Sequence, residues 1–155
     1  LAMFAAAVVP NMATSIESAK RRSFRVSVLT LARRAKVEAI TRGATVNLSL
    51  NNGDFQISSG SETDSTVIGS VSQAPGIEAS HFTKAGEELG EGEWLIAFYP
   101  DGTSDGGAFQ FDEGSDSTSV KIAKKDGRVS VTDGALDPGD TSETEWEAGG
   151  YVQSN

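Results

Sequence analysis

Hydrophobic residues in the first part of the chain follow the pattern of a helix. Residues 1–9 form an unbroken run of apolar and small side chains, and from residue 24 apolar residues recur every three or four positions. Residues at this spacing lie on one face of a helix. Arg42 and Gly43 provide a plausible end, with a cation in the last turn and a glycine cap. The expected helix-to-sheet packing residues are Phe24, Val28, Leu31 and Ala35, continued by Ala39 and widened by Leu29, Ala32 and Ile40.

After Gly43 the pattern changes to the alternation typical of strands. Residues 44–50 alternate cleanly, and an Asn- and Gly-containing turn at 51–54 leads to a returning strand at 55–58. Residues 94–99 are the most apolar run and the best candidate for a central strand. A long N-terminal α-helix packed on a C-terminal antiparallel β-sandwich-like domain is therefore predicted, an α+β fold. Further strands are expected at 66–71, 77–82, 108–111, 119–123 and 128–131, with polar loops at 59–65 and 84–93.

The 155 residues suit a single domain with a modest core, divided into three parts. Residues 1–43 form the predicted helical stem, residues 44–132 the β-rich globular domain, and residues 133–155 an acidic, flexible tail. The chain contains no cysteine, which excludes disulfides, thiol catalysis and cysteine-ligated metals.

Charge is distributed very unevenly between the stem and the remainder of the chain. Residues 1–50 carry a formal charge of +6 and residues 51–155 a charge of −15, which together give the net −9. An acidic body disfavours general nucleic-acid binding, because phosphate neutralisation supplies most of that affinity. No Lys or Arg follows Arg128, so the tail offers no basic surface either.

The apolar run at residues 1–9 is too short to cross a ~30 Å hydrocarbon core, which needs about 20 residues. It lacks the preceding basic region of a signal peptide. Two interpretations remain: a short buried helix end, or the C-terminal part of a longer membrane segment whose beginning precedes Leu1. Pro10 is expected to kink the helix, since proline removes a donor and crowds the preceding turn.

Catalytic chemistry is not indicated by any residue pattern. The carboxylates at 101, 105, 112, 116 and 126 lie in predicted turns, whereas acid–base catalysis needs carboxylates shifted by burial or close pairing. His81 is the only histidine and is expected at the surface or a sheet edge. We therefore predict no enzyme activity and no cofactor. Calcium binding at Asp133, Asp137 and Asp140 is the weaker alternative, because carboxylates at short spacing can bind Ca²⁺ but no EF-hand spacing is present.

Three stretches resemble a known family when taken in order. The apolar run ends in Val8-Val9-Pro10, residues 24–43 read FRVSVLTLARRAKVEAITRG, and residues 98–103 read FYPDGT, followed by Gly107, Phe109, Phe111 and the GRVSV strand at 127–131. In this order and spacing the chain resembles the minor pseudopilins of the GspH/FimT type, from type II secretion and type IV pilus systems. The family's prepilin leader, its cleavage site and the glutamate near the start of the mature helix have no counterpart here, and neither does the tail from Asp133.

The resemblance implies a structural subunit of a type II secretion pseudopilus, which assembles through its N-terminal helix to support protein export. The implied partners are other pseudopilins and the secretion assembly platform, with no nucleic acid and no small-molecule substrate. The implied location is the bacterial inner membrane, single-pass, with the β domain in the periplasm. The alternative is a FimT-like minor pilin of a type IV pilus, involved in DNA uptake.

The resemblance also implies two sets of interaction residues in the stem. The first would contact the membrane and the filament, with Pro10 as the kink. The second is a basic strip that would pair with acids of neighbouring subunits, where ion pairs contribute orientation more than affinity. The membrane and filament set is Leu1, Met3, Phe4, Val8, Val9 and Pro10, and the inter-subunit charge strip is Lys20, Arg21, Arg22 and Arg25.

Overall fold

A computed structural model describes residues 2–61 and 63–136 of the chain. Its single described helix, α1 (Ala2–Arg42), passes through Pro10 without interruption. α1 ends where Gly43 adopts a φ of 63°, and the Ala44 N–H then donates to the Ala39 carbonyl at 3.2 Å. This is the cap that glycine provides at helix ends, and it matches the end predicted from the sequence.

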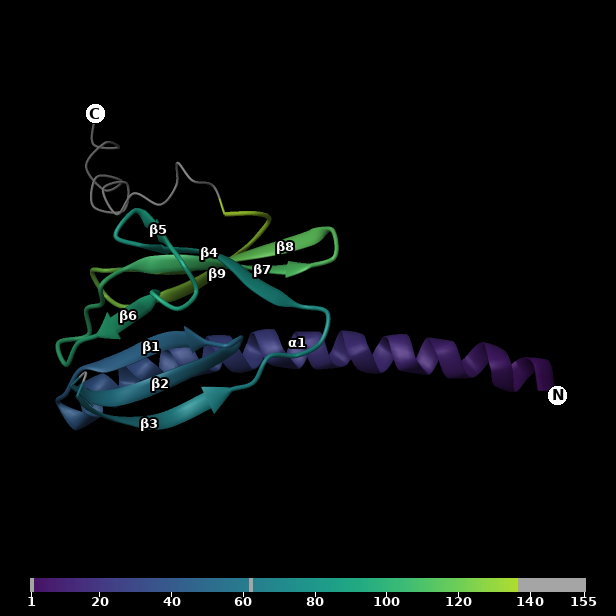
Figure 1. The fold of residues 1–155 in the computed structure, drawn as a ribbon, viewed down its shortest axis with the longest axis horizontal. Coiled ribbons are helices and arrows are strands. Elements are labelled where there is room, and N and C mark those ends of the chain that lie inside the picture. Colours follow the sequence, from purple (N-terminus) through teal and green to yellow (C-terminus); the bar gives the residue numbers. More distant parts are fainter. Residues whose placement is uncertain (1, 62, 137–155) are drawn as a thin grey trace, which may run out of the picture.

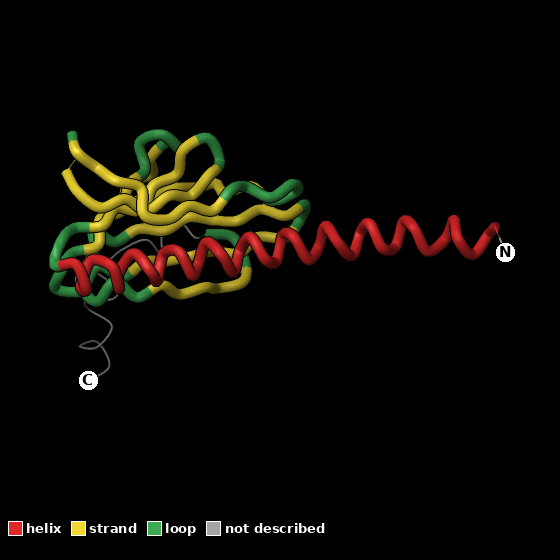
Figure 2. Tube along the Cα trace, turned by 90° about the horizontal axis from the view of Figure 1, so that it is seen from below, coloured by secondary structure: helices red, strands yellow, loops and turns green. Residues whose placement is uncertain are grey.

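The N-terminal part of α1 projects well beyond the strands, while its C-terminal part lies along them (Figures 1 and 2). Within the described residues, no helix contains a stretch long and apolar enough to span a membrane.

Nine strands follow α1 and form two antiparallel sheets in the described part of the chain. The first sheet has the strand order β3-β2-β1-β6, and the second has the order β5-β4-β7-β8-β9. The predicted α+β fold, with a long helix packed on antiparallel sheets, is confirmed (Figure 1). The strands are β1 (Val46–Asn51), β2 (Asp54–Ser61), β3 (Asp64–Val71), β4 (Glu78–Lys84), β5 (Glu87–Leu89), β6 (Leu95–Phe98), β7 (Gly107–Glu113), β8 (Asp116–Ile122) and β9 (Val129–Asp133).

One hydrophobic core joins α1 to both sheets. α1 packs against β1, β2, β3 and β6 and also contacts β9. Phe55 of the first sheet lies 5.1 Å from Phe109 of the second, measured between ring centroids, and both side chains are fully buried. Trp94 is also buried and donates from Nε1 to the Thr83 carbonyl at 2.9 Å, so its polar atom is satisfied.

The most apolar strand does not occupy the predicted central position. β6 lies at the end of the four-stranded sheet, so the prediction that residues 94–99 form a central strand is wrong. The second edge of β6 is instead covered by the loop that follows it: Phe98 forms a bridge with Ser104, and the Asp105 N–H donates to the Ala97 carbonyl at 3.0 Å. β6 is apolar because it is buried between the first sheet, the loop that follows it and the core, although it has no second neighbouring strand among the residues that the structure describes.

Two segments predicted as polar loops contribute strands. Residues 59–61 extend β2 and residues 64–65 begin β3, so the two strands form a hairpin with pairs such as Ser59↔Thr66. Residues 84–93 contain β5, which pairs with β4 through Thr83↔Glu88. Both segments are held by backbone pairing at exposed positions, which the hydrophobic pattern does not reveal.

Candidate functional site

The C-terminal half of α1 anchors the helix to the sheets. The four predicted packing residues Phe24, Val28, Leu31 and Ala35 are all buried, with exposed fractions of 6% or less. The Phe24 ring lies 6.3 Å from that of Phe55 in the first sheet and 5.7 Å from that of Phe111 in the second. Phe24 therefore connects the stem to both sheets near the point where α1 leaves the globular part.

The residues expected to widen this packing stripe behave differently from one another. Ala32 is fully buried and Leu29 packs partly against the core, but Ile40 is 49% exposed. The expectation that Ile40 faces the sheet is therefore wrong. Ile40 lies in the last helical turn, beside the turn at Gly102 rather than above the sheet.

The predicted basic strip separates into two groups. Arg21 Nε lies 3.2 Å from Glu113 Oε1, and Arg25 Nη1 lies 2.8 Å from Glu113 Oε2. These two guanidinium groups therefore hold the end of β7 against the stem of the same chain. Lys20 and Arg22 are exposed and remain accessible to other molecules.

The opposite face of α1 exposes an apolar stripe, which we define as Ile16, Val26, Val37 and Ile40. The exposed fractions are 53%, 57%, 59% and 49%, respectively. The four side chains lie on the side of the helix that faces away from the sheets, and the exposed polar residues Ser23, Thr30 and Arg33 lie between them on that side. Only one apolar face was predicted for the stem, because the polar residues between Ile16, Val26 and Val37 leave no hydrophobic repeat on this side of the helix.

The turn carboxylates act as structural anchors. Partial burial raises the pKa of Asp105, but hydrogen bonds from Tyr99 Oη at 2.5 Å, the Ala97 N–H at 3.1 Å and the Lys84 ammonium outweigh burial and lower it. The same hydrogen bond, together with burial, raises the pKa of Tyr99.

The pKa values of the carboxyl groups in two other turns are also lowered. The Thr103 hydroxyl lowers the pKa of Asp101, and the Arg128 backbone N–H lowers that of Asp126. These groups are therefore held as anions at neutral pH, which is the opposite of what a general acid requires.

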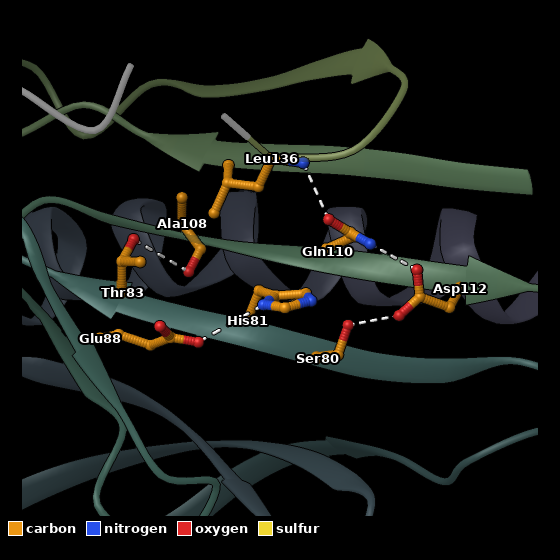
Figure 3. Close-up of polar contacts among 8 residues, drawn as sticks. All are labelled: Ser80, His81, Thr83, Glu88, Ala108, Gln110, Asp112 and Leu136. Atoms are coloured by element: carbon orange, nitrogen blue, oxygen red, sulfur yellow. Dashed lines mark hydrogen bonds and ion pairs between the residues drawn. The ribbon is translucent and has the colours of Figure 1, made fainter. Parts of the chain in front are cut away.

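A polar network covers the outer face of the second sheet, around the lone histidine (Figure 3). Burial raises the pKa of Asp112, but hydrogen bonds from Ser80, Gln110 and Ser117 lower it overall. The Leu136 N–H donates to Gln110 Oε1 at 2.8 Å, so the chain beyond β9 lies across this face. Asp112 is thus a junction between strands rather than a reactive group.

His81 is exposed and lies on β4 with a φ of 50°, where the pairing with β7 shifts register. Its Nδ1 is 3.4 Å from Glu88 Oε1 (Figure 3). A single exposed contact of this kind contributes little to stability, and its partner is a carboxylate rather than a nucleophilic hydroxyl or thiol.

Acidic residues occur at the end of β9 and in the sequence that follows it. Within residues 2–61 and 63–136, no group of three or more His, Asp or Glu side chains is arranged to hold a metal ion. Of the three carboxylates suggested for Ca²⁺, Asp133 ends β9, whereas Asp137 and Asp140 lie outside the described residues. The calcium interpretation stays a prediction.

Comparison with known proteins gives a consistent family and fold. The family model for the type II transport protein GspH matches residues 26–134. No curated protein sequence matches the chain.

Solved structures share the fold at low sequence identity. Two structures of the minor pseudopilin EpsH from the Vibrio cholerae type 2 secretion system match with TM-scores of 0.58 and 0.55 and identities of 11% and 13%. They cover 79% and 74% of this chain and 99% and 96% of their own chains. The type IV minor pilin FimU of Pseudomonas aeruginosa matches with a TM-score of 0.55 and 13% identity, covering 72% of this chain and 91% of its own. At these identities the likeness concerns the fold alone.

Proposed function

Because the chain belongs to the GspH family of type II transport proteins, we propose that it is a minor pseudopilin of a type II secretion system. In this role it is a structural subunit without catalytic activity, assembling through α1 into a pseudopilus that supports protein export. The acids of the turns serve the fold, as their hydrogen bonds indicate.

The observation that carries this proposal is that α1 keeps large apolar side chains exposed on the side that faces away from its own sheets. One face is buried against the sheets of the same chain, and the other exposes Ile16, Val26, Val37 and Ile40. Burying apolar area contributes about 25 cal/mol per Å², so contact between these side chains and another helix would be favourable. α1 also projects beyond its own domain (Figure 2), which suits it to packing among the helices of other pseudopilins.

The location and the other partners follow from the same proposal. The segment with Leu1, Met3, Phe4, Val8, Val9 and Pro10 would lie in the inner membrane before assembly, with the β domain in the periplasm. Lys20 and Arg22, exposed next to this segment, would meet acids of neighbouring pseudopilins or of the assembly platform. Arg21 and Arg25 would serve the subunit's own fold, because both contact Glu113.

A type IV minor pilin is the second candidate, since the fold of FimU is matched about as well as that of EpsH. The two candidates differ in phenotype. Deleting the gene should abolish secretion of exoproteins in the first case and pilus-dependent motility or DNA uptake in the second.

The experiment that tests the proposed function is substitution in the chromosomal gene, followed by measurement of exoprotein in the culture medium. Val26→Asp combined with Val37→Asp should reduce secretion at least about tenfold, because charges on the stripe disfavour burial between helices. Val67→Asp is the matched control, since Val67 is equally exposed, at 55%, but lies on β3. Normal secretion by the double variant, or by the deletion strain, would contradict the proposal.

A further inference from the structure

A cavity of about 690 Å³ opens beside the turn between β1 and β2. Its apolar lining includes Phe24 of α1 and Leu50 of β1, each only 4% exposed. Clefts of ~300–1,000 Å³ are the size that accommodates a bound group. The cavity is thus large enough for a side chain together with part of the turn that carries it.

Apart from Ala79, the remaining lining of the cavity is polar and includes two acids. Glu78 and Glu91 contribute carboxylates, and none of the lining residues is a lysine or an arginine. Glu91 Oε1 accepts a hydrogen bond from the Gly53 N–H at 2.8 Å, which fixes the β1–β2 turn against the loop before β6. Asp54 Oδ1 accepts from the Gln73 N–H at 3.0 Å, so the loop after β3 is fixed as well. The acidic cavity therefore has a defined shape suited to a cation.

A basic turn lies near the C-terminal end of α1, away from this cavity. The β8–β9 turn contains Lys124, Lys125 and Arg128 and one acid, Asp126, which pairs with Arg128 at 3.1 Å, so the formal charge of the turn is +2. A Cβ on Gly127 would come within 3.4 Å of Lys36 Cδ. The cavity adjoins α1 at Phe24, twelve residues before Lys36, which corresponds to about 18 Å along the helix. Lys125 is exposed near the tip of the turn.

We propose that the acidic cavity binds the β8–β9 turn of a second copy of this chain, with Lys125 directed toward Glu78 and Glu91. The inference deepens the proposed function by naming a contact between subunits, and it rests on that function for its place in a filament. Charge complementarity supports a second copy, because one chain carries both the acidic cavity and the basic turn, separated along the stem.

The contact is heterologous, because one copy contributes its cavity and the other its turn. Ion pairs at the rim of an interface set orientation and register and weaken with salt. Contact at the cavity would thus align the β domains of neighbouring subunits, while apolar surface is buried between their α1 helices.

The test measures self-association of the 155-residue chain by sedimentation velocity at two salt concentrations. The Debye length is ~30 Å at about 10 mM salt and ~3 Å at about 1 M. We expect association at low salt that weakens at least about tenfold at high salt, whereas association through the apolar stripe would not weaken. Particles that stay monomeric at low salt would overturn the proposal.

Two charge-reversal variants test whether the cavity and the β8–β9 turn are the surfaces in contact. Glu78→Lys and Lys125→Glu should each weaken low-salt association about tenfold or more, and an equimolar mixture of the two variants should restore it, because reversed charges then face each other. Glu78→Lys keeps the Glu91–Gly53 hydrogen bond, and Glu87→Lys on β5 is the matched control for net charge. Thermal melts of each variant establish that the fold is retained.

The outcomes separate this inference from the proposed function. Association that survives Lys125→Glu but is lost in Arg22→Glu would assign the cavity to a neighbouring stem and overturn the turn as its occupant. A mixture that fails to restore association would also overturn the proposal. If secretion is lost while self-association is intact, the proposed contact is retained. Normal secretion in a strain without the gene would contradict the proposed function and not the contact.

Discussion

Arg25 Nη1 lies 2.8 Å from Glu113 Oε2, and this contact ties the projecting stem to the end of β7. Arg21, one turn earlier, takes the other oxygen of the same carboxylate at 3.2 Å, and the three side chains are each less than one-third exposed. Glu113→Gln keeps the shape but removes the charge, so we expect the free energy of unfolding to fall by about 1–2 kcal/mol. Urea denaturation at low and high salt would measure it.

The control for this carboxylate is Glu88→Gln. The Glu88 side chain contacts the exposed His81 and is itself 69% exposed, so its substitution should change the free energy of unfolding by less than about 0.5 kcal/mol. Equal effects of the two substitutions would show that the Arg21–Glu113–Arg25 cluster does not stabilise the stem.

The buried and exposed sides of α1 should differ in their response to the same substitution. Leu31 is 6% exposed and Val37 is 59% exposed. Leu31→Asp buries an uncompensated charge, which costs several kcal/mol and is comparable to the ~5–15 kcal/mol stability of a domain. Val37→Asp should change the free energy of unfolding by less than about 0.5 kcal/mol. Circular dichroism melts of both variants would decide, and a near-native melt of Leu31→Asp would refute the packing.

The sequence was sufficient to predict the elements in which buried and exposed side chains follow a regular pattern. Residues 44–50 alternate because Val46, Leu48 and Leu50 enter the core while their neighbours do not. The end of α1 was recognisable because Gly43 adopts a conformation that few other residues tolerate. The β2–β3 hairpin beyond Ser58 was not recognisable, because its stability comes from backbone hydrogen bonds that any polar residue can make.

The interaction surfaces were harder to predict than the fold. Lys20, Arg21, Arg22 and Arg25 form one basic run in the sequence, yet Arg21 and Arg25 contact Glu113, which is about ninety residues away. The cavity is lined by residues of α1, β1, the β1–β2 turn, β4 and two loops, so no local pattern indicates it. Both depend on how the sheets are arranged around the helix, and that arrangement is not encoded in hydrophobic periodicity.

Acid should weaken the fold through Asp105. Its pKa is lower in the folded chain than its ordinary value near 3.9, so its stabilising contribution is present above that value and is lost as the pH falls through the folded-state pKa. Asp105→Asn should lower stability at neutral pH and make the free energy of unfolding less dependent on pH below about 4. Tyr99→Phe removes one hydrogen bond to Asp105 and should have a smaller effect in the same direction. Unfolding curves between neutral and acidic pH would measure both, and an unchanged acid slope in Asp105→Asn would contradict this assignment.

Two glycines with the same backbone conformation should differ in how they tolerate a methyl group. Gly127 and Gly114 have φ values of 63° and 60°, so alanine costs about 1 kcal/mol of backbone strain at either position. A Cβ at Gly114 would meet nothing within 4 Å, whereas at Gly127 it would lie 2.9 Å from the Gly102 carbonyl oxygen, a backbone atom that cannot rotate away. We therefore expect Gly127→Ala to lower the free energy of unfolding by roughly 1 kcal/mol or more beyond Gly114→Ala. Equal losses in urea denaturation would show that the β8–β9 turn can move away from Gly102. The turn would then be too loosely held to present Lys125 in one orientation.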